Sequence, residues 1–530
     1  MSSLTETPST RQETPAQPEA PNNRTEVFAV HGADPEVLAY AMAKYSRSAL
    51  SMKESLREIS SQRAEQFLNT FYFQYGHRSI ADLAHIAFAI ERLSLLAAIT
   101  LVDEQRWDGQ ERSTRYQNFR KSGWYLPDFG SDTASSQLYV ATIEKLFAEY
   151  HTVFEAVLAS LREQVRKPDE MKQEAYDRTL KARAFDVARY LLPLATNTSL
   201  GQIVNARTLE TQISRLLSHP VAEVRQLGEK LQAAASGAAW NVHGSDLAAL
   251  QQEIAALDPA LGERAAALLT REVKTAPTLV KYAASNDYQL RTRDELRQAA
   301  AELLGGEPVD DAPLVDLVVD AEPLEVEIAT TLLYGACHSP YRQIRRHVAE
   351  LSEARRNEII DLGVRHRGRH DELLREFSSG HALRFDILMD IGGFRDMHRH
   401  RRCVQILQTF TPQHGYDIPD GVPEAGVQPL YEEVMRTAHA AFGRIADGTA
   451  PEAAQSAQYV LPLATKKRAL FKMDFAEALY ISELRSAPQG HFSYRRVAWE
   501  MYRVVQRTHP VLARYFRATD ADAPVDLLQR

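Results

Sequence analysis

The chain has 530 residues, of which 44% are hydrophobic and 25% are charged. One ordinary hydrophobic core does not hold a chain of this length, so we expect two or three globular domains. The sequence has no apolar run long enough for a transmembrane helix. Its net charge of −8 argues against a broad cationic surface for nucleic acids.

Residues 1–25 are rich in Ser, Thr, Pro, Glu and Gln and lack an apolar core. This composition predicts a disordered tail and differs from that of a secretory signal peptide. The two cysteines, Cys337 and Cys403, form no C-x-x-C pair, so we expect neither a disulfide framework nor a zinc ribbon. We therefore expect a soluble protein in a reducing, cytoplasmic compartment.

Three pairs of segments match in the same order along the chain, which indicates an internal duplication. The matched pairs are 25–48 with 315–339, 123–128 with 415–420, and 190–196 with 459–465. The boundary between the copies falls near residue 310, after a turn-forming Gly-Gly-Glu-Pro segment. We therefore predict two tandem domains, residues 26–305 and 310–520.

Each half combines long helical patterns with short strand patterns, so the predicted class is α/β or α+β. We expect helix-rich halves with a central mixed sheet in each. The predicted helices are 136–166, 205–233, 245–272, 342–362, 429–446 and 491–508. The predicted strands are 26–30, 314–319 and 383–388.

The segment Gly76-His77-Arg78-Ser79-Ile80-Ala81-Asp82 precedes an apolar stretch, 83–101, that we expect to be one long helix. Ser79 and Asp82 have the spacing of a capping box. A helix N-terminus attracts phosphate and other anions because its N–H groups are unpaired. The alternative is a plain N-cap with His77 packed nearby.

Farther along, Glu111-Arg112-Ser113-Thr114-Arg115-Tyr116 places hydroxyl and guanidinium groups close together. These groups could clamp a phosphate, and Glu111 could position a polar ring or sugar. The alternative is an exposed charged loop.

These segments resemble the family of flavin-dependent thymidylate synthases over residues 27–233. The landmarks YGHRSIAD, ERSTRY, WYLP, ARYLLP (188–193) and NARTL (205–209) follow the family's order. The family's Arg-His-Arg triplet, which contacts flavin and nucleotide, is replaced by Asp103-Glu104-Gln105. We expect these acids to repel both ligands.

The second half supplies the missing triplet as Arg399-His400-Arg401. Arg485 also resembles a family arginine that contacts substrate phosphate. In contrast, Thr409 stands where the family has Ser-x-Arg-Tyr, Gln458 replaces the arginine before Leu-Pro, and Asp474 begins a degraded Asn-Ala-Arg motif. The losses in the two halves are therefore largely complementary.

Three other interpretations of the basic segments are weaker. Arg365-His366-Arg367 also spells the triplet, but it reads as a solvated charged run. His398 and His400 lack a third ligand, so we expect no metal site. Residues 395–402 lack the interleaved aromatic side chains of a nucleic-acid patch.

The resemblance implies that the halves form a pseudo-dimer with one composite site, and that two chains pair as a homodimer. FAD would take hydride from NADPH, methylenetetrahydrofolate would supply the methylene group, and dUMP would become dTMP. Ser113 would position substrate, because no His–Asp pair stands beside it to activate a nucleophile. The alternatives are a flavoenzyme acting on another pyrimidine nucleotide and a non-catalytic homologue that binds nucleotide or flavin.

The resemblance also assigns residues to each ligand. The expected catalytic residues are Arg399, Ser113 and Arg115. The expected flavin-binding residues are His77, Ser79, Asp82, Asn205, Arg207, Arg399, His400 and Arg401. The expected nucleotide-binding residues are Glu111, Ser113, Arg115, Arg189 and Arg485.

Overall fold

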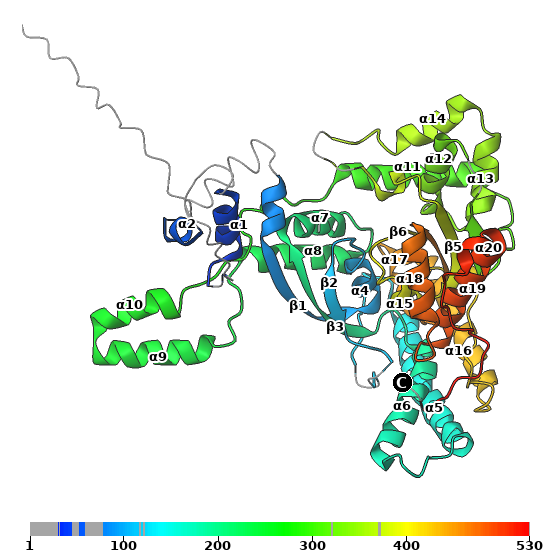
Figure 1. The fold of residues 1–530 in the computed structure, drawn as a ribbon, viewed down its shortest axis with the longest axis horizontal. Helices are drawn as coiled ribbons and strands as arrows, with labels where there is room; N and C mark the ends of the chain where they lie inside the picture. The colour runs from blue at the N-terminus through cyan, green and yellow to red at the C-terminus, as the bar shows by residue number, and fades with distance from the viewer. Residues whose placement is uncertain are drawn as a thin grey trace, which may run out of the picture.

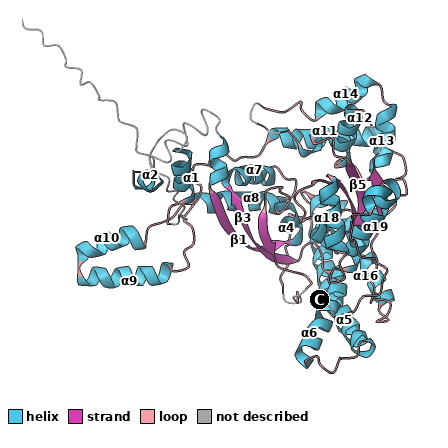
Figure 2. Ribbon diagram, viewed as in Figure 1, coloured by secondary structure: helices cyan, strands magenta, loops and turns pink. Residues whose placement is uncertain are grey.

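The computed structural model describes residues 30, 32–44, 52–58, 78–115, 118–119, 122–319, 322–368, 371 and 373–528. Two separate small sheets, each accompanied by helices, organise the described part of the chain (Figure 1 and Figure 2). The fold is helix-rich α+β, as the sequence predicts. No helix in the described part is long and apolar enough to cross a bilayer. The predicted N-terminal tail and His77 lie outside the described residues.

The elements of the first half are α1 (Pro35–Lys44), α2 (Met52–Glu58), η2 (Arg78–Leu83), β1 (His85–Ser94), α4 (Leu95–Leu101), β2 (Asp108–Glu111), α5 (Thr133–Gln164), α6 (Gln173–Ala188), η3 (Arg189–Leu191), β3 (Asn197–Asn205), α7 (Ala206–Leu217), α8 (Ala222–Ser236), α9 (Gly244–Leu257) and α10 (Pro259–Leu269). The segment α11 (Asp287–Leu304) then leads to the second half.

The elements of the second half are β4 (Val315–Val318), α12 (Leu324–Tyr334), α13 (Tyr341–Glu350), α14 (Glu353–Leu362), η4 (Arg375–Phe377), β5 (Leu383–Asp390), α15 (Ile391–Met397), β6 (Val404–Leu407), η5 (Pro412–His414), α16 (Gln428–Ala446), α17 (Ala453–Ala457), η6 (Gln458–Val460), β7 (Lys466–Met473), α18 (Phe475–Ser486), α19 (Phe492–Thr508) and α20 (Pro510–Ala513).

Both sheets are antiparallel, so the prediction of a mixed sheet is wrong. The strand orders are β1-β3-β2 and β4-β5-β7-β6. In the first sheet, β3 pairs antiparallel with β1 on one side and with β2 on the other. The two strands that run in the same direction are therefore kept apart, and no parallel pair forms.

The predicted single helix over 83–101 is also wrong, because residues 85–94 form strand β1. Exposed and buried side chains largely alternate along this strand, with Ile86 and Ile90 buried. Helix α4 begins only after Ser94, whose hydroxyl oxygen accepts a hydrogen bond from the Ala97 N–H at 2.9 Å. The apolar stretch therefore contains two shorter elements with different periods.

The other predicted elements are largely present. Strands 314–319 and 383–388 correspond to β4 and β5, whereas 26–30 lies almost wholly outside the described residues. Helices 136–166, 429–446 and 491–508 correspond to α5, α16 and α19. The remaining three predictions each span two helices: α7 with α8, α9 with α10, and α13 with α14. Short capping segments interrupt each of these patterns.

Helices α9 and α10 form a hairpin that projects from the body of the molecule (Figure 1). Gly262 lets them approach closely, because an added Cβ would lie 2.5 Å from the Ala255 backbone. Helix α9 buries no residue. The hairpin leaves four large apolar side chains exposed: Leu250, Leu257, Leu261 and Leu268.

The two halves meet through their matched Leu-Pro segments, which pair antiparallel around Pro193 and Pro462. The Leu194 N–H donates to the Leu461 carbonyl, and the Leu463 N–H donates to the Leu192 carbonyl, both at 3.0 Å. Equivalent residues thus exchange equivalent bonds, which is the pattern of a local two-fold axis. The duplication read from the sequence therefore folds as a pseudo-symmetric pair.

The same symmetry relates the contacts that tie the second and third matched segments together. Trp124 bridges to Thr196 in the first half, and Tyr416 bridges to Thr465 in the second. The Asn197 N–H donates to the Gly123 carbonyl, as the Lys466 N–H donates to the Gly415 carbonyl, both at 2.9 Å. The sheets of the two halves are therefore flanked by the same backbone arrangement.

In each half, a buried helix-capping residue forms a hydrogen bond with a residue of a neighbouring helix. The hydroxyl belongs to the capping residue in the first half and to its partner in the second half. In the first half, Ser94 caps α4 and donates its hydroxyl to Glu223 of α8, which also accepts from Tyr459. In the second half, Asp390 caps α15 and accepts from the hydroxyl of Ser493 of α19. Each arrangement keeps one carboxylate and one hydroxyl beside the cap.

The buried carboxyl of Asp390 should make the free energy of unfolding depend on pH. Burial, helped by the charge of Asp417, raises the pKa of Asp390 from 3.8 to about 6. A carboxyl whose pKa rises on folding stabilises the fold fully below its unfolded pKa, and this contribution is lost as pH rises through the folded pKa. Relative to Asp390→Asn, we expect the wild-type free energy of unfolding to fall by about 2 kcal/mol as pH rises from about 4 to about 6.5.

Urea unfolding of both proteins across this range measures the difference. Asparagine keeps an oxygen for the Gly393 N–H, so the helix cap itself is preserved. A difference that does not change with pH contradicts the raised pKa of Asp390.

Candidate active site

The turn after strand β2 carries the first half's predicted nucleotide residues to the boundary with the second half. Strand β2 pairs with β3, which places Glu111 opposite Leu200. In the turn, the Ser113 hydroxyl oxygen accepts a hydrogen bond from the Arg115 N–H at 3.2 Å. Ser113 therefore shapes the turn that holds Arg115.

Arg115 is buried and joins the two halves. Its Nε and Nη2 atoms donate to the two carboxylate oxygens of Asp186 at 2.8 and 3.2 Å. Its Nη1 atom donates to the Tyr494 hydroxyl of α19 at 2.9 Å, and Nη2 reaches the Gln489 carbonyl at 3.4 Å. Burial lowers the pKa of Arg115, but the charge and hydrogen bonds of Asp186 outweigh burial and raise it.

Arg189 and Arg395 approach the same turn from opposite halves. Arg189, at the start of η3, is 2% exposed and donates to the Thr114 hydroxyl at 3.1 Å. Arg395 on α15 pairs with Glu111 and reaches the same hydroxyl at 3.4 Å. Among the described residues, the buried Arg189 Nε and Nη2 and the buried Arg395 Nε have no hydrogen-bond acceptor. The fold therefore leaves these buried donors unsatisfied.

The interhalf cluster is the name we give to these side chains. Its members are Glu111, Thr114, Arg115, Asp186, Arg189, Arg395, Asp396 and Tyr494. Burial raises the pKa of Asp396, but neighbouring guanidinium charges outweigh burial and lower it. These charges belong to Arg189, Arg399, Arg115 and Arg485. The structure therefore brings together four of the predicted arginines, two from each half.

Arg485 and the second-half triplet border the interhalf cluster. The Arg485 Nε atom donates to His400 Nε2 at 2.8 Å, and its guanidinium lies 5.5 Å from the Tyr494 ring centroid. Burial lowers the pKa of His400 and outweighs the hydrogen bond that the His400 ring donates to the Glu477 carboxylate. Because Nε2 accepts the Arg485 Nε–H, the His400 ring carries its proton on Nδ1. Arg399 is exposed.

Three of the predicted flavin residues lie elsewhere. Arg207 pairs with Asp82 at 3.3 Å, and Arg106 lies 3.7 Å from the same carboxylate. Asn205 caps α7 by accepting from the Thr208 N–H at 2.8 Å. Asn205 is five residues along β3 from the position opposite Glu111, which is about 17 Å at strand spacing. Of Ser79, the structure describes only the backbone, within η2.

The acidic triplet of the first half is an ion-pair partner within the fold. The Asp103 carboxylate lies 2.6 Å from Arg375 Nη1 and 3.8 Å from His398 Nε2, both of the second half. Burial raises the pKa of Asp103, but the charges of Arg375, His398 and Arg215 outweigh burial and hold it well below its usual range. Arg401 packs over the Trp107 ring at 5.0 Å, so it also contacts the first half.

No group of three His, Cys, Asp or Glu side chains in the described ranges is arranged to hold a metal ion. His398 hydrogen-bonds Gln405 at 2.7 Å, so it has a structural partner. Arg365 and His366 both pair with Glu295 of α11. The His366 side chain is 9% exposed, so the prediction of a fully solvated run is wrong at this residue.

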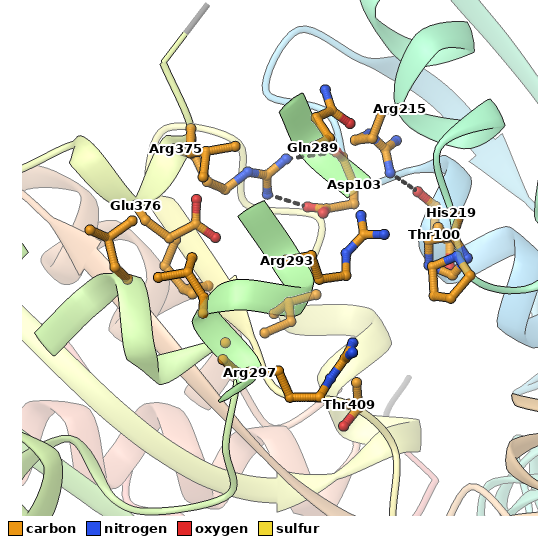
Figure 3. A pocket seen from close by; sticks show the side chains of 18 of the residues that line it. Thr100, Asp103, Arg215, His219, Gln289, Arg293, Arg297, Arg375, Glu376 and Thr409 are labelled. Atoms are coloured by element: carbon orange, nitrogen blue, oxygen red, sulfur yellow. Dashed lines mark hydrogen bonds and ion pairs between the residues drawn. The ribbon is translucent and has the colours of Figure 1, made fainter. Parts of the chain in front are cut away.

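A cavity of about 2,100 Å³ lies between the two halves (Figure 3). Gln458, which matches Arg189 in the paired Leu-Pro segments, lines this cavity, so the cavity lies where the local two-fold axis would place a second interhalf cluster. Helices α4 and α7 of the first half, helix α11, and the β6 end of the second half all contribute to its walls. Arg207 lines the cavity, and so do Asp103, Thr409 and Gln458. Sequence reasoning missed the arginines that α11 and η4 add to it, Arg293, Arg297 and Arg375.

These contacts predict what happens when the family's basic residue is restored at position 103. In Asp103→Arg, a new guanidinium would face Arg375 and His398. We expect the free energy of unfolding to fall by about 1–3 kcal/mol, a range reduced because the Asp103–Arg375 pair is partly exposed. The matched control is Asp108→Arg, an exposed position on β2. Equal unfolding curves for the wild type and Asp103→Arg contradict this account.

The chain is similar in sequence to proteins of two descriptions. The chain is 27% identical over 531 residues to a UPF0159 protein of Chlamydia pneumoniae, covering 94% of this chain and 92% of that protein. It is 24% identical over 211 residues to a flavin-dependent thymidylate synthase of Clostridium tetani, covering 37% of this chain and 81% of that protein.

Among solved structures, thymidylate synthase X of Helicobacter pylori with FAD and dUMP is 18% identical, with a TM-score of 0.26, covering 38% of this chain and 88% of that chain. Two stretches of the present chain, residues 28–238 and 315–511, match the model of a single family. This protein therefore belongs to the thymidylate synthase complementing protein family, of which it contains two tandem copies.

Proposed function

We propose that this protein is an FAD-dependent enzyme that methylates dUMP to dTMP, with methylenetetrahydrofolate as the methylene donor and NADPH as the reductant. Membership of the family over both halves supports flavin-dependent nucleotide methylation as the general activity. The observation that carries the proposal is the convergence of four predicted arginines around Asp396, beside buried guanidinium donors that lack acceptors.

The interhalf cluster fits the phosphate group of a nucleotide. A phosphate offers several acceptor oxygens, and guanidinium groups bind such oxygens in pairs. Arg115, Arg189 and Arg485 would hold the phosphate, and Ser113 would position the nucleotide through the turn it shapes. Glu111 would face the uracil or the sugar. Because Arg189 and Asp396 are separated by 3.8 Å, a phosphate can compete with this contact.

The cavity fits FAD in size and in lining. Its volume of about 2,100 Å³ exceeds the ~300–1,000 Å³ usual for small-molecule sites, so a dinucleotide can enter. Arg207, held by Asp82, offers a cation for the diphosphate at one end, and Leu96 and Ile99 provide an apolar wall. Asn205 stands at the start of the same helix. When bound, FAD supplies the hydride for the reduction.

The second-half triplet supplies fixed positive charge beside the nucleotide. The guanidinium groups of Arg399 and Arg485 can stabilise negative charge that develops on the uracil ring. Neutral His400 accepts the Arg485 Nε–H and thereby fixes the direction of that guanidinium. Arg401, held over Trp107, would contact the flavin from the same segment.

A nucleotide-binding homologue without catalysis is the second candidate. It is favoured by the separation of Arg207 and Asn205 from the interhalf cluster along β3. Activity on another pyrimidine nucleotide is the third. An assay for dTMP from dUMP, NADPH and methylenetetrahydrofolate, together with the flavin absorbance spectrum of the purified protein, separates them. A yellow, inactive protein selects another nucleotide, and a colourless protein that cannot take up FAD selects binding alone.

Arg399 gives the sharpest variant for this proposal because its side chain is exposed and three other arginines remain beside Asp396 when it is removed. We expect Arg399→Ala to lower kcat/KM for dTMP formation by about 100-fold or more, the loss typical of removing a charge-stabilising donor. The matched control is Arg402→Ala, an exposed arginine three residues along the chain. If both variants retain wild-type kcat/KM, the triplet takes no part in the reaction.

A further inference from the structure

The cavity has lost the cations that mark the interhalf cluster. By the sheet registers and the matched segments, Ser113, Arg115 and Arg189 correspond to Thr409, Thr411 and Gln458. Duplicated active sites would carry the same residues at both positions. The cavity is therefore not a second copy of the interhalf cluster, and its chemistry depends on other side chains.

Helix α11 brings new cations into this space. It occupies 287–304, between the two stretches that match the family model. Arg293 and Arg297 are four residues apart, so they project from one face of the helix. Figure 3 shows the Arg293 guanidinium beside Asp103, and the Arg297 guanidinium directed toward Thr409.

Arg293 is held by a backbone carbonyl rather than by one of the acidic side chains that lie near it. Its Nη1 atom donates to the Ser218 carbonyl at 2.9 Å, and it forms no ion pair within the described part of the chain. Burial lowers the pKa of Arg293, and the charges of Arg297 and Arg215 lower it further, whereas Asp294 and Glu376 partly oppose this effect. A guanidinium that is largely removed from water and faces like charges is costly unless an anion joins it.

The pKa of His219 also shows the effect of the positive charges near Arg293. Burial lowers the pKa of His219 to about 3, and the charges of Arg293, Arg215 and Arg225 add to this effect. The nearby carboxylates are already engaged, because Glu104 pairs with Arg215 and Asp103 with Arg375. Asp294 likewise pairs with Arg297 at 2.9 Å, so Arg293 is the guanidinium among these described side chains that forms no ion pair.

The walls beside these arginines are apolar. Leu296 and Ala300 of α11 face the cavity from one side, and Ile406 and Phe410 face it from the other. A planar ring can pack against such walls while an attached phosphate meets the guanidinium groups. Arg215 is eight residues from Arg207 on α7, about 12 Å along the helix, so this position is distinct from the Arg207 end.

We propose that the Arg293 end of the cavity binds a phosphate ester of the nucleotide class, with its phosphate held by Arg293 and Arg297. This site is separate from the interhalf cluster and does not depend on the proposed reaction. Nucleotide, flavin and free pyrophosphate share the required anionic chemistry, so binding measurements with each of them identify the source.

The test is calorimetric titration of the full chain with dUMP, FAD and inorganic pyrophosphate, and with deoxyuridine and riboflavin as ligands without phosphate. The proteins are the wild type, Arg293→Gln/Arg297→Gln, Arg297→Gln and the control Arg291→Gln, which is exposed on another face of α11. We expect at least one phosphate ligand to bind at least tenfold more weakly to the double variant and more weakly to Arg297→Gln.

Binding of deoxyuridine and riboflavin should be the same in all four proteins, and Arg291→Gln should match the wild type. Unchanged affinity of all three phosphate ligands for the double variant overturns the proposal, as does an equal loss in Arg291→Gln. Arg297 is largely exposed, so its single variant keeps the test valid if the double variant folds poorly. A protein that binds phosphate here but forms no dTMP refutes only the proposed reaction.

Discussion

The antiparallel pairing of the two Leu-Pro segments is the contact on which the rest of the structure depends. Four backbone hydrogen bonds join residues 190–195 to residues 459–464, and every one has its symmetry counterpart. Because η3 and η6 continue directly from these segments, Arg189 and Gln458 are carried to opposite sides of the axis. The pairing thereby creates two related positions between the halves, and the interhalf cluster and the cavity occupy one each.

Charge then distinguishes the two positions. At the interhalf cluster, arginines from both halves converge on Asp396, and several of their N–H donors lack acceptors. On the other side of the axis, Asp103 replaces the triplet's first arginine and binds Arg375. The acid that we expected to repel ligands instead neutralises a cation of the other half. Asp103, which stands in place of the triplet's first arginine, therefore contributes an ion pair to the contact between the copies.

The sequence predicted the duplication, the helix-rich α+β class and the strands β4 and β5, because these depend on local pattern and on repeated segments. The sequence did not predict strand β1, because most of its residues are apolar and a two-residue period is not visible. The alternation becomes apparent only from the burial of side chains such as Ile86 and Ile90. The sequence analysis also assigned Arg207 and Arg399 to the same flavin site, because motifs in a sequence do not show how far apart their residues lie in the fold. The sequence analysis did not predict a role for Arg293, because α11 lies outside the repeated segments. Only the tertiary packing brings α11 to the cavity.

The central claim is that residues from both halves of one chain form one nucleotide site at the interhalf cluster. Its most direct test is dTMP formation by co-expressed Arg115→Gln and Arg399→Ala chains, one altered in each half. Each single variant should be inactive, and the mixed population should remain inactive, because neither chain holds an intact site. Recovery of activity in the mixture would contradict the claim, since it would show that the halves of different chains build the site together.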